Sequence, residues 1–341
     1  METTRMASSH SISKRAIRSS PVLTQRTQLV FKRLNQMLGY PCLAYWTSTG
    51  GSICQNDVMA MAQLLHEHKH DKKVGLFLKS DGGNPEAALR LVHLLRNAFG
   101  RVILFAPFEC ASAATMVAMG ADEIHMGSTS FLTAVDTSLK HDLSPVDTRN
   151  NLVSVSQDEV MRILRMWKEQ KTGDNPYAEV YKYLHPLVIG SLDRSSSLSI
   201  RICKELLSYH MKDVKKAERI SRELNSAYPS HSYPITAREA RRLGLTIRNI
   251  DPHVEGLLQE LNKCYSTMSQ SIVTDYDEFN NHSNEICNIL ERENLQIYYQ
   301  VDKDWHYRKD ERRWVTMNDK SDWHRVERAG QKWANTTFFI R

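Results

Sequence analysis

The sequence predicts an α/β protein in which short buried strands alternate with amphipathic helices. Val74–Lys79 is a short and largely apolar run, and residues 101–106 form a second one. Runs of this kind fit the strands of a sheet that is covered on both faces. Between them, alanine and leucine recur at helical spacing through residues 84–100, which predicts an amphipathic helix.

Segments before this unit extend the pattern. Residues 22–38 have the apolar period of a helix, and Cys42–Thr47 reads as a first strand. Asn56 or Asp57 is placed to cap a helix that continues to Leu65.

Segments after it are mostly helical. Residues 121–126 read as a short strand, and a helix follows from Ser156 or Asp158. Two more helices are expected at 195–210 and 211–224. Thr236 and Glu239 have capping-box spacing, Gly244 is placed to end that helix, and residues 245–247 form a last short strand.

Composition narrows the classes of function. The chain has 341 residues, of which 41% are hydrophobic, and no apolar run is long enough for a membrane helix. The net charge of +6 is modest, so we expect a solvated basic surface and no nucleic-acid partner. The six cysteines lack the spacing of a zinc site or a disulfide framework, which favours free thiols in the cytoplasm. His66, His68 and His70 alternate without acidic or cysteine partners, and we expect no metal site there.

A glycine pair follows one buried strand, and a single hydroxyl follows the next. Gly82 and Gly83 lack a Cβ, so backbone N–H groups there are able to turn toward a ligand. Ser112 lies among small residues at the expected first turn of a helix, where free N–H groups favour a developing oxyanion. This arrangement suits an acyl-transfer nucleophile, with Cys110 as a second candidate. The structural alternative is an ordinary turn and a serine that caps or packs a helix.

The order of these motifs is shared with a known group of proteins. It reads strand, Asp81-Gly82-Gly83, helix, strand, Ala111-Ser112-Ala113-Ala114, helix and Ala121-Asp122-Glu123-Ile124. Similar segments follow at 185–194, 230–235 and 238–245. The pattern resembles the serine dehydrogenase proteinase family of the Clp/crotonase superfamily, which is akin to signal peptide peptidase A. The resemblance covers roughly residues 40–250, and it implies an α/β spiral of ββα units with helical extensions.

The resemblance also implies roles for individual residues. Ser112 corresponds to the nucleophile, and the backbone N–H groups of Gly83 and Ala113 correspond to the oxyanion hole. The base histidine of the Clp proteolytic subunit would fall near Thr133 or Ala134, so a Ser-His-Asp triad of that kind is absent. Residues 132–136 also replace the Leu-Gly-Pro-Ile-Asp of the branch, which puts the loop beside the nucleophile in question.

The sequence offers several candidates for the general base. Peptidases of the signal peptide peptidase type use a lysine from a region after the nucleophile helix, and burial is able to lower a lysine pKa far enough. By distance along the chain, Lys168 is the first candidate, with Lys171 and Lys140 beside it. His185 and His231 are alternatives, either as bases or as side chains that hold a loop. His125 is expected to be structural.

Three parts of the chain follow from these observations. Residues 1–21 are expected to form a disordered basic tail, and residues 22–250 a Clp/crotonase-like core with a helical insert. Residues 251–341 are expected to form a helical and tryptophan-rich extension, with a helix at 254–268 and a second amphipathic stretch at 279–290.

We therefore predict an ATP-independent serine endopeptidase that acts on proteins or peptides, needs no metal or organic cofactor and self-associates. Two rival functions are a catalytically inactive scaffold of the same fold and a crotonase-type acyl-thioester enzyme. The sequence names neither the substrate nor the number of subunits.

Overall fold

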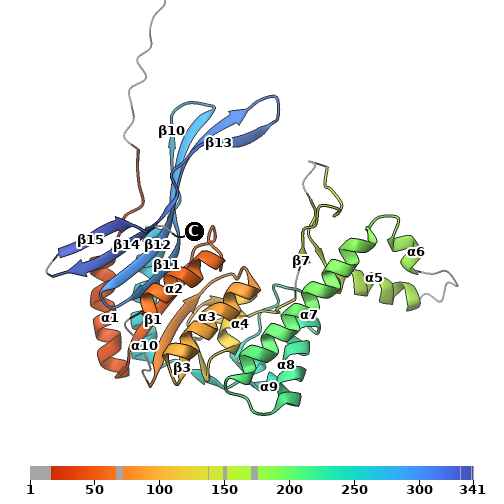
Figure 1. Cartoon of the computed structure of the whole chain (residues 1–341), viewed down its shortest axis with the longest axis horizontal. Coiled ribbons are helices and arrows are strands. Elements are labelled where there is room, and N and C mark those ends of the chain that lie inside the picture. Colours follow the sequence, from red (N-terminus) through yellow and green to blue (C-terminus); the bar gives the residue numbers. More distant parts are fainter. Residues whose placement is uncertain are drawn as a thin grey trace, which may run out of the picture.

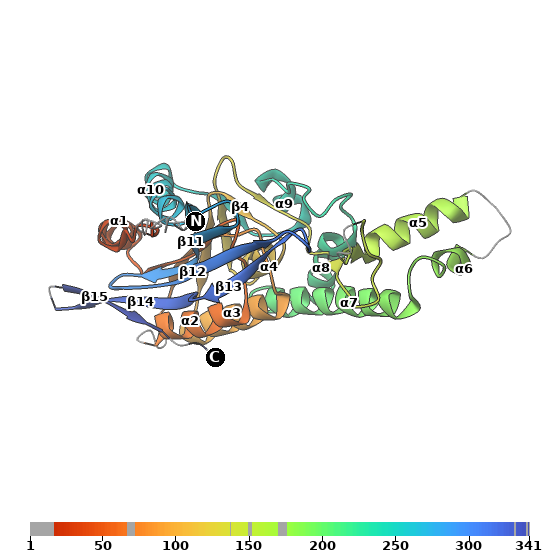
Figure 2. The ribbon, with the colours of Figure 1, turned by 90° about the horizontal axis from the view of Figure 1, so that it is seen from above.

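The structure is a computed structural model that describes residues 17–66, 72–136, 138–148, 152–169, 176–330, 332–338 and 340. Figures 1 and 2 show a large central sheet with helices on both faces and a helical arm at one end. The helices are α1 (Thr24–Leu38), α2 (Gln55–Leu65), α3 (Pro85–Ala98), α4 (Ala113–Met119), α5 (Gln157–Glu169), α6 (Pro176–Val180), α7 (Pro186–Ser208), α8 (Val214–Ser226), α9 (Ala237–Leu243) and α10 (Pro252–Met268). None of these described helices is long and apolar enough to cross a bilayer.

One 11-stranded sheet dominates the described residues, and two short pairs accompany it. The strands of the large sheet are β1 (Cys42–Thr47), β2 (Val74–Lys79), β3 (Val102–Ala106), β5 (Glu123–Met126), β9 (Ile247–Asn249), β10 (Ile272–Asp275), β11 (Asn280–Arg292), β12 (Leu295–Arg308), β13 (Arg313–Asp319), β14 (Asp322–Ala329) and β15 (Lys332–Thr337). The short pairs are β4 (Glu109–Cys110) with β6 (Phe131–Leu132), and β7 (Ser138–Leu139) with β8 (Val155–Ser156).

The sheet has a parallel half, from β1 to β9, and an antiparallel half, from β1 to β15. Its main order is β15-β14-β12-β11-β1-β2-β3-β5-β9, and every pair from β1 to β9 is parallel. Parallel strands need crossover connections, and the helices after β1, β2 and β4 supply them. The predicted α/β fold with helical extensions is confirmed, and its assignment to the Clp/crotonase type stays a prediction.

Side chains from the two faces of the sheet enter separate cores. Leu76 and Leu78 of β2 belong to the core shared with α2, α3, α4 and α7. Phe77 between them belongs to the core shared with α1 and α10, where its ring stacks 6.4 Å from that of Tyr265. All six residues of β2 are buried, which is why this strand reads as a continuous apolar run and not as an alternating one.

The C-terminal part is built into the same sheet. The predicted helix at 254–268 is confirmed as α10, but the amphipathic stretch expected at 279–290 is strand β11. This strand pairs with β1 on one side and with β12 on the other. Its Glu291 is fully buried and accepts hydrogen bonds from Thr27 of α1 (2.5 Å) and Tyr265 of α10 (2.8 Å). Burial raises the pKa of this carboxyl to about 7.

Several predicted element ends differ from the observed ones. The N-cap of α2 is Cys54, and Asp57 lies three positions inside, where its carboxylate accepts from the Cys54 N–H at 2.6 Å. Thr236 is the N-cap of α9 and Gly244 its left-handed C-cap, but the Thr236 side chain makes no capping hydrogen bond. Within the segment predicted as a disordered tail, Ser20 is buried and its N–H donates to Asn284 of β11 at 2.9 Å.

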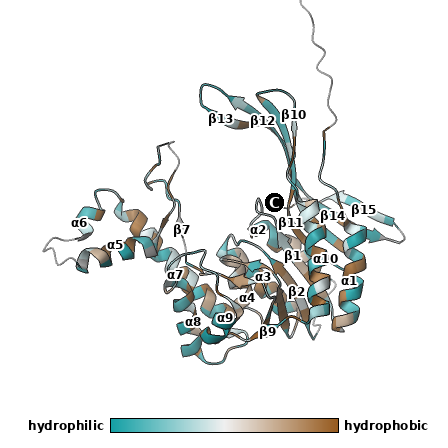
Figure 3. Ribbon diagram, turned by 180° about the vertical axis from the view of Figure 1, so that it is seen from behind, coloured by the Kyte–Doolittle hydropathy of each residue, from teal (hydrophilic) through white to brown (hydrophobic). Residues whose placement is uncertain are grey.

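A helical arm extends from the end of the molecule opposite β15 (Figures 1 and 2). It consists of α5, α6 and the first half of α7, with a small apolar cluster of its own formed by Val160, Leu164, Leu184, Val188 and Leu192. Figure 3 shows the arm standing clear of the sheet and its covering helices.

Candidate active site

Three segments meet beyond the carboxyl ends of β2 and β4. The chain after β2 continues to pair with β4 through a parallel bridge between Ser80 and Cys110. The Ala111 N–H donates to the Ser80 carbonyl at 2.9 Å. The third segment, residues 132–136, is joined by a hydrogen bond of 2.8 Å from the Ser112 N–H to the Thr133 hydroxyl. These contacts bring the glycine pair and Ser112 together, although thirty positions separate them.

Ser112 has an unusual backbone conformation. Its φ of 52° and ψ of −118° lie outside the regions that non-glycine residues normally occupy. It is half-buried and connects the end of β4 to the start of α4. A serine on a sharp, strained strand-to-helix turn is the arrangement that presents the nucleophilic hydroxyl of α/β-hydrolases. Strain of this kind costs on the order of 1–3 kcal/mol and persists only where the surroundings enforce it.

Both glycines are required by the space around them. Gly82 has a φ of 108°, and a Cβ there would lie 2.6 Å from the Ser112 Cβ. Gly83 has a φ of 147°, and a Cβ there would lie 2.3 Å from the Ile53 carbonyl oxygen. Ile53 itself bridges Gly83, because its N–H donates to the Gly82 carbonyl at 2.8 Å and its own carbonyl accepts from the Asn84 N–H. The glycine pair is therefore held between the 50–54 loop and Ser112.

Two backbone N–H groups at this junction have no partner within the described part of the chain. They belong to Gly83 and Ala113, the positions expected to form an oxyanion hole. The Ser112 hydroxyl likewise makes no hydrogen bond to any described residue. The junction thus combines a hydroxyl on a strained backbone with free donors, but none of the described basic side chains touches that hydroxyl.

Thr133, one of the two positions where the histidine of the Clp proteolytic subunit was expected to fall, contacts Ser112 directly. Its hydroxyl accepts from the Ser112 N–H and donates to the Ala134 carbonyl at 3.1 Å, and its own N–H donates to the Thr115 hydroxyl of α4 at 3.1 Å. These bonds fix the segment beside Ser112 without a Gly-Pro turn. No local pattern predicts this role, since an isolated threonine fits many positions.

A histidine–aspartate pair lies farther along the same segment. Leu132 and Ile235 form an antiparallel bridge. Asp136 lies four residues after Leu132 and His231 four residues before Ile235, and His231 Nδ1 lies 2.7 Å from Asp136 Oδ1. The hydrogen bond to Asp136 raises the pKa of His231. His231 is about half exposed. At about 3.3 Å per residue, Asp136 lies roughly 10 Å along the chain from Thr133.

The lysine candidates lie elsewhere. Lys168 belongs to α5 on the helical arm, which Figures 1 and 2 place away from α4. Lys140 is exposed between β7 and β8, and Lys171 lies outside the described residues. The structure therefore does not bring any described lysine of the same chain to Ser112, and the assignment of Lys168 stays a prediction.

Other candidates have structural surroundings. The Cys110 thiol is fully buried, and this burial raises its pKa, which disfavours it as a nucleophile. His125 pairs with Glu123 at 3.0 Å and packs edge-on against Phe105. His185 caps α7 by accepting from the Leu187 N–H.

Among the described residues, no group of three or more His, Cys, Asp or Glu side chains is arranged to hold an ion. His68 and His70 of the alternating histidine stretch lie outside these residues.

Comparison with known proteins gives similarity at the level of fold. No protein-family profile matches the sequence. A relative from Methanocaldococcus jannaschii, described as uncharacterized protein MJ0137, is 24% identical over 193 residues, which are 57% of this chain and 59% of that protein. The chain thus spans less than two thirds of the length of this relative.

Similar solved structures are serine peptidases. A lysine-to-alanine mutant of the 1510-N membrane-bound stomatin-specific protease, in complex with a substrate peptide, has a TM-score of 0.37 at 16% identity, over 63% of this chain and 76% of that one. A serine-to-alanine mutant of the same protease has a TM-score of 0.38 at 14% identity, over 66% and 83%. ClpP1 from Listeria monocytogenes has a TM-score of 0.35 at 12% identity, over 69% and 99%. Scores at this level carry no conclusion about the chemistry of this chain.

Proposed function

We propose that this protein is a serine peptidase in which Ser112 attacks the carbonyl of a protein or peptide substrate. The observation that carries the proposal is the strained backbone of Ser112, held against Gly82 and beside the unpartnered N–H groups of Gly83 and Ala113. A fold gains no stability from straining a half-buried serine, so the strain points to a functional use.

The two N–H groups suit a tetrahedral intermediate. When the Ser112 oxygen adds to a carbonyl carbon, negative charge develops on the carbonyl oxygen. Free backbone donors fixed beside the nucleophile stabilise that charge without reorganising. Removing one donor of an oxyanion hole typically lowers the rate about 100- to 1000-fold.

Two residues are candidates for the base that accepts the Ser112 proton. Lys168 is the residue implied by family resemblance, and because α5 stands apart from α4, it would have to come from a second copy of the chain. His231 is favoured by its pairing with Asp136 on the segment that contacts Ser112. A shift of the 230–235 segment on substrate binding would have to bring His231 nearer.

A fluorophosphonate probe tests the nucleophile. We expect covalent labelling of the wild-type protein, none of Ser112→Ala, and unchanged labelling of Ser128→Ala, whose serine is exposed in the turn after β5. No labelling of a folded wild-type protein over a broad pH range would refute the peptidase and favour an inactive scaffold, which the lack of a base beside Ser112 among the described residues supports. Binding of coenzyme A esters without labelling would instead favour an acyl-thioester enzyme.

The pH dependence of labelling separates the two bases. If His231 is the base, the rate rises with pH above about 6.5, the ordinary pKa of histidine, because its pKa is raised. Asp136→Asn then moves this rise to lower pH, and His231→Gln removes it. If Lys168 is the base, Lys168→Met abolishes labelling. In that case Asp136→Asn and His231→Gln leave the pH dependence of the labelling rate unchanged.

A further inference from the structure

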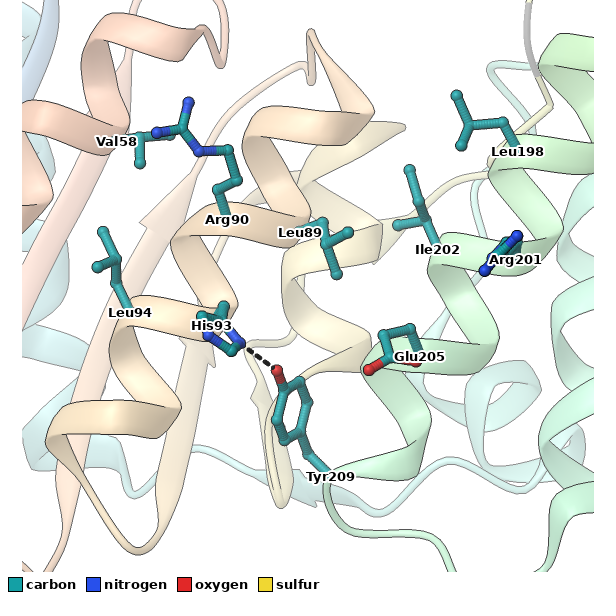
Figure 4. A pocket seen from close by; sticks show the side chains of 10 residues that line it. All are labelled: Val58, Leu89, Arg90, His93, Leu94, Leu198, Arg201, Ile202, Glu205 and Tyr209. Carbon is teal, nitrogen blue, oxygen red and sulfur yellow. Dashed lines mark hydrogen bonds between the residues drawn. The ribbon is translucent and has the colours of Figure 1, made fainter.

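A surface groove of about 480 Å³ runs between α3 and α7, with Val58 of α2 at one edge (Figure 4). Its volume lies in the range of small-ligand and peptide side-chain sites. Val58 and Ile202 are buried, while Leu89 and Leu94 are half-buried and Leu198 is 37% exposed. The groove therefore offers a largely apolar surface.

Charged groups divide the groove into two ends. Arg90 and Arg201 lie on opposite walls toward the N-terminal end of α3 (Figure 4). The Arg90 guanidinium donates to Gln55, and Arg201 has no partner among the described residues. At the other end Tyr209 is held by a hydrogen bond of 2.8 Å between its hydroxyl and His93, close to Glu205. Positive charge without compensation is thus concentrated at the arginine end.

The arginine end adjoins the candidate active site through both walls. Helix α3 starts immediately after the glycine pair, and seven residues at 1.5 Å each place Arg90 about 10 Å from Gly83 along the axis. On the other wall, the Ser199 hydroxyl of α7 donates to the Val135 carbonyl at 2.7 Å, two residues from Thr133. An extended chain of about three residues covers 10 Å.

We propose that this groove binds an acidic and apolar segment of the substrate, on the same substrate chain whose scissile bond lies at Ser112. Separate acidic side chains pair with Arg90 on one wall and Arg201 on the other, and apolar side chains pack on Leu89, Leu198 and Ile202. Arginine suits this role because its guanidinium forms bidentate bonds to a carboxylate. The acidic residue lies at least about three residues from the bond that is cut. This proposal rests on the proposed peptidase function and specifies its substrate class.

A binding measurement tests the groove apart from catalysis. Fluorescence anisotropy would follow a fluorescein-labelled peptide of alternating leucine and glutamate pairs binding to the full-length Ser112→Ala protein. Arg90→Glu with Arg201→Glu should weaken binding at least about tenfold, because attraction becomes repulsion at two positions. Leu198→Gln should weaken it about threefold through lost apolar contact. Thermal melting followed by circular dichroism would check that each variant is folded.

The matched control reverses two charges on the other face of the sheet. Arg26→Glu with Lys32→Glu on α1 changes the net charge equally and should leave binding unchanged. Equal binding of a peptide with lysine in place of glutamate, or equal weakening by the control, would overturn the groove proposal. If Ser112→Ala binds the acidic peptide specifically but the wild-type protein is not labelled by fluorophosphonate, the groove is supported as a ligand site and the peptidase is refuted.

Discussion

Gly82→Ala tests whether the close approach of the glycine pair to Ser112 is needed. The added Cβ would lie 2.6 Å from the Ser112 Cβ, 2.8 Å from the Ala111 carbonyl oxygen and 3.1 Å from the Ala113 nitrogen. An ordinary contact begins near 3.4 Å, so Ser112 or the glycine loop must move by about 0.8 Å. The backbone φ of 108° is also unfavourable for alanine.

The expected effects follow from these distances. A strained backbone position costs about 1–3 kcal/mol, and overpacking adds a similar amount, so we expect a loss of about 2–5 kcal/mol in stability. At about 2 °C per kcal/mol for a domain of this size, Tm falls by about 4–10 °C. A misplacement approaching 1 Å lowers the rate of Ser112 labelling about 100-fold.

Thermal melting and the rate of fluorophosphonate labelling measure the two effects separately. Gly256→Ala is the control, because a Cβ at this exposed position in α10 meets nothing within 4 Å. We expect that change to stabilise the protein by about 0.5–1 kcal/mol and to leave labelling unaltered. Wild-type labelling and melting of Gly82→Ala would show that the contact with Ser112 does not matter, and our reading of the site would fail.

Two more predictions concern buried polar groups. Glu291 keeps its proton to about pH 7 when folded but only to about 4.5 when unfolded, so stability falls as pH rises through this window, by about 3 kcal/mol. The stability of Glu291→Gln relative to wild type should therefore rise by about that amount between pH 4.5 and 7 in urea titrations, and a constant difference would contradict the assignment. Thr133→Val leaves the Ser112 N–H without its acceptor and should cost about 1–3 kcal/mol and slow labelling, whereas Thr133→Ser should retain both properties. Equal behaviour of the valine and serine variants would refute the role of this hydroxyl.

Local patterns were sufficient for the parallel half of the sheet. Cys42–Thr47 and Val74–Lys79 were predicted with their observed bounds, because strands buried on both faces need continuous apolar residues. Strand β11 was not predicted, since its polar residues alternate irregularly with apolar ones. What makes it a strand is pairing with β1 and β12 on either side, and no local window contains those partners.

The candidate site was partly accessible from sequence for the same reason. Motif order pointed to the meeting of Gly83, Ser112 and Ala113, but not to Gly82 as the residue that packs against the serine. The pairing of Asp136 with His231 was also missed, because it depends on a bridge between segments about one hundred residues apart. Residue type alone does not carry such information.

The position of β11 bears on how the protein is made. Gly51, in the loop that bridges Gly83, packs directly against Cys287 and Asn288 of β11. The Asn288 side chain also donates to the Ser52 carbonyl and to buried Asp57. On the ribosome, the loop that supports the glycine pair lacks this backing until β11 has emerged from the exit tunnel. If Ser112 is the nucleophile, a newly synthesised chain would therefore remain inert toward its neighbours until residue 292 has left the tunnel.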